Sequence, residues 1–131
     1  MTERSSKAKF EVTLVLLPPV WLSAGRTGVQ LDWFEKAGLR LVAVKMVALG
    51  NLQLTHFFAE RLHEDELAQR LERLSDQPLL VLALHGAAAV SYGCEWLALY
   101  RSEAVYASPS AAEAARDLAF FFKPRELFFN P

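Results

Sequence analysis

The stretch WFEKAGLRLVAVKM, residues 33–46, decides how this chain folds, because it joins the end of a helix to the start of a strand. Apolar side chains at helical spacing, Phe34 among them, predict a short helix that opens at Gly28. Gly38 closes that helix, since glycine adopts the left-handed backbone of a helix end without steric cost. Residues 39–49 follow at once with the apolar alternation of a strand. The chain is therefore predicted to combine helices with a sheet.

Strands and helices alternate on both sides of this stretch. Upstream, KFEVTLVLLPP at 9–19 predicts a buried strand that its two prolines end. Downstream, the apolar periodicity predicts one long or two abutting helices at 54–74, a strand at 79–86, a helix at 87–101, a short strand at 104–108 and a capped helix at 110–122. This order predicts an α+β, ferredoxin-like βαββαβ fold, with helices on one face of a four-stranded antiparallel sheet. The other face then needs a second cover, which another subunit could supply.

Length and composition indicate an ordinary globular protein. The chain has 131 residues, of which 53% are hydrophobic and 22% charged, which suits a single domain at 10–131 behind a flexible N-terminal tail at 1–9. The formal net charge is -1. No global field therefore favours nucleic acid or an anionic membrane as a partner.

The cellular setting follows from cysteine use and from the N-terminus. A single cysteine, Cys94, excludes an internal disulfide and a multi-cysteine metal site. The N-terminus is polar, and no apolar run is long enough to act as a signal peptide or a transmembrane helix. A cytoplasmic protein without a metal or other cofactor is expected.

Several segments of the sequence resemble nucleoside diphosphate kinases. TLVLLPPVWL at 13–22, TGV at 27–29 and WFEKAGLRLVAVKM at 33–46 are similar, without a gap, to family segments of the kind TLVLIKPDAV, GEI and RFEKKGLKLVALKM. The likeness resumes in HFFAE at 56–60, in PLLVLALHG at 78–86 and in the last helix. The resemblance covers most of the chain and implies the fold of that family.

The resemblance places a tyrosine where the family has its nucleophile. Such kinases move a γ-phosphoryl group between nucleotides through a phosphohistidine, and Tyr106 occupies the position of that histidine. A phenol with a pKa of about 10 is a poorer nucleophile at neutral pH than an imidazole, and no base beside it is identifiable from the sequence. Glu103 replaces a family asparagine and adds negative charge. Transfer through Tyr106 is therefore not expected.

Other phosphate-binding positions differ in the same comparison. Pro18 stands at the family's lysine and Cys94 at its arginine, and neither residue carries a charge or a fork of donors. Phe58 replaces the tyrosine of the HYAE motif, and only residues 97–103 remain of a long loop that carries a further arginine and threonine in the family. Because phosphoryl transfer depends on positioning and charge neutralisation, these losses together predict a chain that is not an enzyme.

Five residues are candidates for a remnant of the site. Ser108 matches a family serine, and Asp117 stands where the family has the carboxylate that orients the histidine. A structural interpretation is favoured for both, with Ser108 in a turn and Asp117 on a solvated helix face. His85, near the end of a strand, is favoured as a structural histidine. The candidate remnant is Phe58, His85, Tyr106, Ser108 and Asp117.

Three functions follow from these observations. The first is a catalytically inactive kinase-like domain that acts as an interaction or regulatory module, with an unknown protein partner and as a homodimer. The second is a sensor that binds a nucleotide or another small ligand in a reduced pocket. The third is residual kinase activity through Tyr106 or another residue. The phenylalanine-rich C-terminus, residues 120–122 and 128–129, either packs on the body or forms a partner surface.

Overall fold

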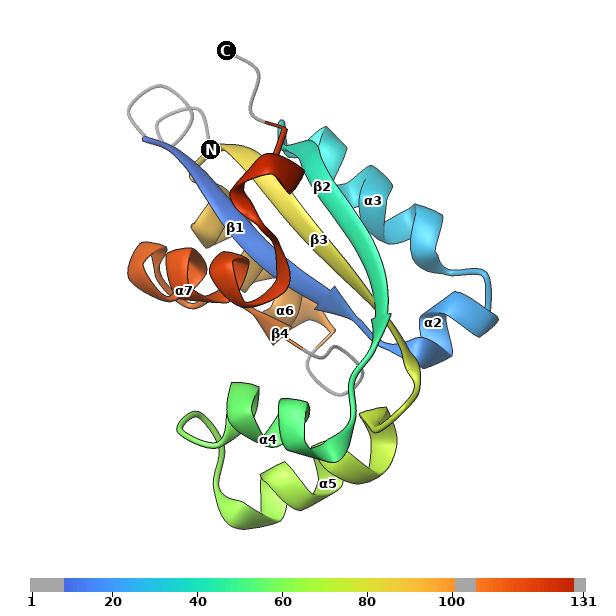
Figure 1. The fold of residues 1–131 in the computed structure, drawn as a ribbon. Coiled ribbons are helices and arrows are strands. Elements are labelled where there is room, and N and C mark those ends of the chain that lie inside the picture. Colours follow the sequence, from blue (N-terminus) through green and yellow to red (C-terminus); the bar gives the residue numbers. More distant parts are fainter. Residues whose placement is uncertain (1–8, 101–105, 129–131) are drawn as a thin grey trace.

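The structure is a computed structural model that describes residues 9–100 and 106–128. Four strands form one sheet in the order β2-β3-β1-β4, and every neighbouring pair is antiparallel (Figure 1). The strands are β1 (Phe10–Leu17), β2 (Arg40–Ala48), β3 (Pro78–Ala87) and β4 (Tyr106–Ala107). This arrangement confirms the predicted ferredoxin-like α+β fold.

The helices follow the predicted order, with two refinements. They are α2 (Pro19–Ser23), α3 (Thr27–Lys36), α4 (Asn51–Phe58), α5 (Glu64–Leu74), α6 (Ala89–Leu99), α7 (Ala111–Phe121) and the 3-10 turn η1 (Pro124–Glu126). The periodic region 54–74 forms two helices rather than one. The prolines that end the first strand also begin the short helix α2, because proline suits the first position of a helix.

The junction between α3 and β2 matches the expectation from the sequence. Gly38 has a φ of +89°, and the backbone turns there from α3 into β2. β3 approaches this turn closely at Gly86. A Cβ atom at Gly86 would lie 2.7 Å from Leu39 Cδ2 and 3.0 Å from the Gly38 carbonyl oxygen. The turn thus fixes both the end of the helix and the pairing of the two strands beside it.

One face of the sheet is covered by α3 and α6, which lie behind it in Figure 1. Large side chains are buried on this side, and Trp21, Phe34 and Trp96 are fully inaccessible to solvent. Trp96 Nε1 donates a hydrogen bond of 2.8 Å to Gln30 Oε1, which satisfies two buried polar atoms. This layer is the helical cover that the sequence predicts.

The opposite face is covered by α7 of the same chain, and α4 and α5 pack against the same core at one end of the sheet (Figure 1). The second cover, which another subunit could have supplied, therefore comes from within the molecule. Leu118, Phe121 and Phe122 are buried against the sheet there, whereas Phe128 is 71% exposed. The C-terminus is thus partly packed, with the Phe128 N–H donating a 2.8 Å hydrogen bond to the Val42 carbonyl. Phe129 lies outside the described residues.

Candidate functional site

A cavity of about 530 Å³ opens between the α4–α5 pair, α6 and the start of α7. Its walls are largely apolar, and two arginines, one carboxylate and one phenol supply the polar groups. The lining residues are Phe58, Arg61, Leu62, Arg70, Cys94, Leu97, Ala98, Tyr106, Ala107, Pro109 and Glu113. An apolar cavity with a few convergent polar groups is the usual form of a small-molecule site.

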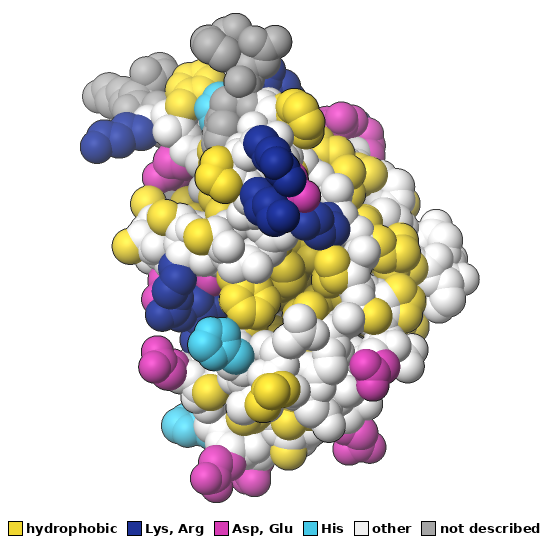
Figure 2. All heavy atoms as spheres, in the orientation of Figure 1, with side chains coloured by type: hydrophobic (Ala, Val, Ile, Leu, Met, Phe, Trp, Pro, Cys, Tyr) yellow, Lys and Arg dark blue, Asp and Glu magenta, His cyan; other side chains and the backbone are white. Residues whose placement is uncertain are grey.

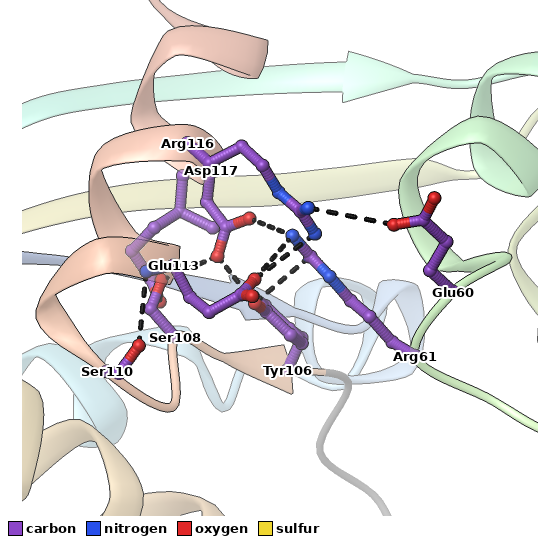
Figure 3. Close-up of polar contacts among 9 residues, drawn as sticks. Glu60, Arg61, Tyr106, Ser108, Ser110, Glu113, Arg116 and Asp117 are labelled. Atoms are coloured by element: carbon purple, nitrogen blue, oxygen red, sulfur yellow. Dashed lines mark hydrogen bonds and ion pairs between the residues drawn. The ribbon is translucent and has the colours of Figure 1, made fainter.

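Tyr106 is one of the residues that line this cavity. β4 positions it, because Tyr106 pairs with Leu16 of the central strand β1, and only 9% of the residue is exposed. Its ring packs edge-on against Phe57 at 5.2 Å between centroids. Its hydroxyl donates a 2.5 Å hydrogen bond to Asp117 Oδ2 and accepts one of 3.0 Å from Arg61 Nη1 (Figure 3).

Asp117 on α7 is fully buried and accepts hydrogen bonds from three side chains. Besides Tyr106, these are Ser108, whose Oγ lies 2.8 Å from Oδ2, and Arg61, whose Nη2 lies 2.6 Å from Oδ1 (Figure 3). The prediction that Asp117 sits on a solvated helix face is therefore wrong. Ala114 and Leu118, which lie at helical spacing on α7, share the buried face of the helix with Asp117.

Arg61 is the functional residue that the sequence reasoning misses. It lies just after α4, and only 14% of its side chain is exposed. Besides Tyr106 and Asp117 it binds Glu113, with 2.9 Å between Nη2 and Oε1, and its guanidinium lies 4.4 Å from the centroid of the Phe57 ring. The available signal is weak: Arg61 is the first cation after the HFFAE segment.

The predicted cap of α7 is present in a modified form. Ser110 Oγ accepts a 3.1 Å hydrogen bond from the Glu113 backbone N–H, as expected of an N-cap. The carboxylate of Glu113 binds Arg61 and Arg116 at 2.9 and 3.2 Å. The cap therefore fixes the start of α7 while its glutamate takes part in the charge cluster around Arg61.

The surroundings change the acidity of three side chains at the cavity. Burial raises the pKa of the Tyr106 phenol far above its ordinary value, and the hydrogen bond to Asp117 and the charge of Asp117 raise it further. Burial also raises the pKa of the Cys94 thiol, and it lowers the pKa of the Arg70 guanidinium, to which the nearby charge of Arg73 adds. At neutral pH the phenol is therefore protonated at rest, and Cys94 is a thiol rather than a thiolate.

The structure separates the other sequence candidates. Phe58 and Cys94 line the cavity with Tyr106. His85 pairs with Val12 of β1, four residues from the partner of Tyr106, so about 13 Å of strand lie between them. His85 instead contacts the Phe10 ring at 5.5 Å.

Pro18 and Glu103 stand at two other positions that differ from the family's motifs. Pro18 lines a different surface depression, with Arg73 and Pro78. Glu103 lies outside the described residues. Within residues 9–100 and 106–128, no group of three or more histidine, cysteine, aspartate or glutamate residues is arranged to hold a metal ion.

Known proteins match this chain over most of its length. The family described as nucleoside diphosphate kinase matches residues 11–98. A protein named nucleoside diphosphate kinase from Actinobacillus pleuropneumoniae serotype 3 is 30% identical over 88% of this chain and 96% of its own length. One with the same name from Psychromonas ingrahamii is 30% identical over 89% of this chain and 94% of its own. The family match ends before β4 and α7, so Tyr106, Ser108 and Asp117 lie beyond it, whereas Arg61 lies within it.

Solved structures show the same fold. The Aquifex aeolicus nucleoside diphosphate kinase superposes with a TM-score of 0.78 at 21% identity, covering 91% of this chain and 99% of the other. The Borrelia burgdorferi nucleoside diphosphate kinase, solved as a transition state mimic with vanadate and ADP, gives 0.77 at 18% identity, covering 93% and 92%.

These relatives contradict the prediction of an inactive module that is not an enzyme. Proteins that are 30% identical over 88–89% of the chain carry the name of an enzyme. The prediction rests on residues that differ from the family's motifs, and it assumes that nothing takes their place. Around Tyr106, however, Asp117 supplies a carboxylate, and Arg61 and Arg70 supply positive charge. The module and the sensor both require a chain without chemistry and are set aside.

Proposed function

The chain belongs to the nucleoside diphosphate kinase family, and we propose that it is an enzyme of this class. It transfers the terminal phosphoryl group of a nucleoside triphosphate to a nucleoside diphosphate, in the cavity beside Tyr106. The single observation that carries the proposal is the composition of this cavity, in which Arg61 and Arg70 face a mostly apolar wall. Phosphates need positive charge and a nucleobase needs apolar surface, so the cavity offers both.

Arg70 suits an anionic ligand for an electrostatic reason. Its guanidinium lies 5.3 Å from the centroid of the Phe58 ring and is partly withdrawn from water, and burial lowers its pKa. A phosphate beside it would replace lost hydration with charge-assisted hydrogen bonds. Arg61 adds a second cation, which two carboxylates already orient. The related kinase from Borrelia burgdorferi was solved with ADP and vanadate, which are ligands of the class proposed for this cavity.

The test is transfer between two nucleotides. Purified protein given ATP and a second nucleoside diphosphate is expected to form the second triphosphate, as measured by chromatography of the nucleotides. Arg70→Ala should weaken nucleotide binding by tenfold or more, because a lost hydrogen bond to a charged group costs about 1.5–3 kcal/mol. A thermal-shift titration of both proteins with ATP measures that difference.

The matched control is Arg73→Ala, on the same helix but beside a different depression. This variant should bind ATP as the unaltered protein does. Absence of the second triphosphate, in a preparation that unfolds cooperatively and is free of contaminating kinase, would overturn the proposal. If Arg70→Ala and Arg73→Ala weaken ATP binding equally, Arg70 has no specific role in binding phosphate.

We also propose that the protein forms a homodimer through β2. This strand is at the edge of the sheet, and Val44 and Met46 on it are 53% and 60% exposed. Figure 2 shows hydrophobic side chains over this part of the sheet, below a group of basic side chains at the C-terminal turn. A long edge strand with exposed apolar side chains is a template for pairing with a second chain.

Charge on the exposed part of β2 should dissociate this dimer. Met46→Lys is expected to give a monomer at concentrations where the unaltered protein is a dimer, as measured by sedimentation velocity. Leu99→Lys is the control, because Leu99 is 64% exposed at the end of α6, a helix that packs mainly against β1 and β4 rather than the edge strand β2. An unaltered protein that sediments as a monomer, or a Met46→Lys variant that remains a dimer, would disprove the proposed interface.

The domain organisation and the cellular location of the chain are also proposed. We propose one domain at 10–131 behind the tail 1–9, and a cytoplasmic location, which the single cysteine supports. No helix in the described part of the chain is long and apolar enough to cross a membrane. Limited proteolysis that leaves 10–131 intact, and fractionation with a cytosolic marker, are the corresponding measurements.

A further inference from the structure

We propose that Tyr106 carries the phosphoryl group between the two nucleotides as an O-phosphotyrosine, with Asp117 as the base that takes up its proton. The proposal rests on the function proposed above, and it names the residue that performs the transfer. It corrects the expectation from the sequence that no base lies beside the phenol. Tyr106 lines the cavity, and its phenol oxygen lies 2.5 Å from the carboxylate of Asp117, which lines the neighbouring depression that Arg61 also borders.

Among the nucleophilic side chains of the described residues, Tyr106 differs from the others in its place at the cavity and in its contact with a carboxylate. It is the one hydroxyl among the residues that line the cavity. Ser108 also reaches the Asp117 carboxylate, but it is fully buried and does not line the cavity. Cys94 lines it, yet its thiol lies against the Ser108 carbonyl oxygen at 3.7 Å and has no contact with a base. Among the nucleophilic side chains of residues 9–100 and 106–128, only Tyr106 both lines the cavity and donates to a carboxylate.

The transfer balances in atoms and charge. The Tyr106 oxygen attacks the terminal phosphorus of a nucleoside triphosphate, and a new oxygen–phosphorus bond forms. The bond between that phosphorus and the bridging oxygen breaks, and the nucleoside diphosphate leaves with the electron pair. The phenolic proton passes along the existing hydrogen bond to Asp117 Oδ2. In the second half, a different nucleoside diphosphate attacks the phosphotyrosine, and Asp117 returns the proton to the phenol oxygen.

The neighbours of the phenol explain how a weak acid acts as the nucleophile. Because burial and Asp117 raise its pKa, no phenolate forms in advance, and the proton leaves only as the new bond forms. Arg61 assists at that moment, since the 3.0 Å hydrogen bond from its charged guanidinium strengthens as negative charge develops on the phenol oxygen. The same guanidinium binds the second oxygen of Asp117 at 2.6 Å, which keeps Oδ2 directed at the phenol.

The chemistry of an aryl ester also suits a carrier that must release its phosphoryl group again. An unperturbed phenol has a pKa of about 10, well below that of an aliphatic hydroxyl. Burial raises the pKa of Tyr106, but it would raise that of a buried serine hydroxyl as well, so the phenolate is still the better leaving group of the two. A phosphotyrosine can therefore return its phosphoryl group to a nucleoside diphosphate more readily than a phosphoserine can. This difference again favours Tyr106 over Ser108.

The experiment is to incubate the protein with γ-labelled ATP, separate it from nucleotide and identify the labelled residue. We expect label that survives both acid and alkali, as an aryl phosphate does, on the peptide that contains Tyr106. Label should be absent from Tyr106→Phe and present in Tyr100→Phe, a variant of another tyrosine. Labelled protein mixed with unlabelled nucleoside diphosphate should transfer its label, and the steady-state kinetics should be ping-pong.

Three results would overturn the proposal. Acid-labile label would indicate a phosphorylated nitrogen, and label on any other peptide would indicate another carrier. Transfer between nucleotides without labelled protein would indicate direct transfer, and it would leave the proposed kinase function intact. Absence of both label and transfer would instead overturn the kinase function. Peptide mapping of the unaltered protein needs no variant, so the test stands even where Tyr106→Phe does not fold.

Discussion

Replacing Asp117 with alanine is expected to lower the free energy of unfolding by about 3–5 kcal/mol, since the change breaks a buried ion pair and leaves its partner charge behind. Asp117 is fully buried and accepts hydrogen bonds from Tyr106, Ser108 and Arg61. Without it, the guanidinium of Arg61 loses its shortest contact, the Tyr106 hydroxyl loses its acceptor, and Ser108 keeps only a 3.4 Å contact with the Leu14 carbonyl oxygen. A loss of this size is a large part of the stability of an ordinary domain.

Chemical denaturation followed by tryptophan fluorescence measures this loss. Arg116→Ala is the matched control, one residue earlier on the same helix. Its side chain is 54% exposed, and its ion pairs with Glu60 and Glu113 lie at the surface, so a change of about 0–1 kcal/mol is expected. If Asp117→Ala and Arg116→Ala lose the same small amount, Asp117 is not the buried anchor of this cluster.

The fold was accessible from the sequence because its signals are local. Phe34 and Gly38 lie a few residues apart and together specify a helix, its end and the strand that follows. The periodicity of the remaining segments places the other strands and helices within a few residues. The cover of the second sheet face could not be identified from the sequence, because periodicity shows that α7 has an apolar side but not which surface it packs on.

The site was only partly accessible, because its parts meet from distant positions in the chain. Comparison position by position identified Tyr106, Ser108 and Asp117 but not their contacts. Arg61 lies 45 residues before Tyr106 in the chain and donates to its phenol oxygen only in the folded state. Nothing in its own neighbourhood of the sequence marks it as buried or paired. Judging each lost residue separately therefore predicted an inactive chain, whereas the folded arrangement supplies a carboxylate and a cation at the phenol.

The proposed transfer predicts a much larger effect of Asp117→Asn on rate than on structure. An asparagine has nearly the same shape and keeps an oxygen that accepts a hydrogen bond, but it does not take up the phenolic proton. We expect kcat to fall by about 10²- to 10⁴-fold, the usual contribution of a positioned general base. Near-ultraviolet circular dichroism of the folded variant should match that of the unaltered protein, and nucleotide transfer is measured well below its unfolding temperature.

Glu113→Gln is the control that separates a base from a neighbouring negative charge. Glu113 binds the same guanidinium as Asp117, with 2.9 Å to Arg61 Nη2, but no hydrogen bond joins it to the phenol. If Asp117 acts as the base, Asp117→Asn slows transfer far more than Glu113→Gln does, and phosphotyrosine forms slowly in the first variant. If both slow transfer equally, the two carboxylates act by orienting Arg61. The phenolic proton must then pass to another acceptor, such as an oxygen of the nucleotide phosphate itself.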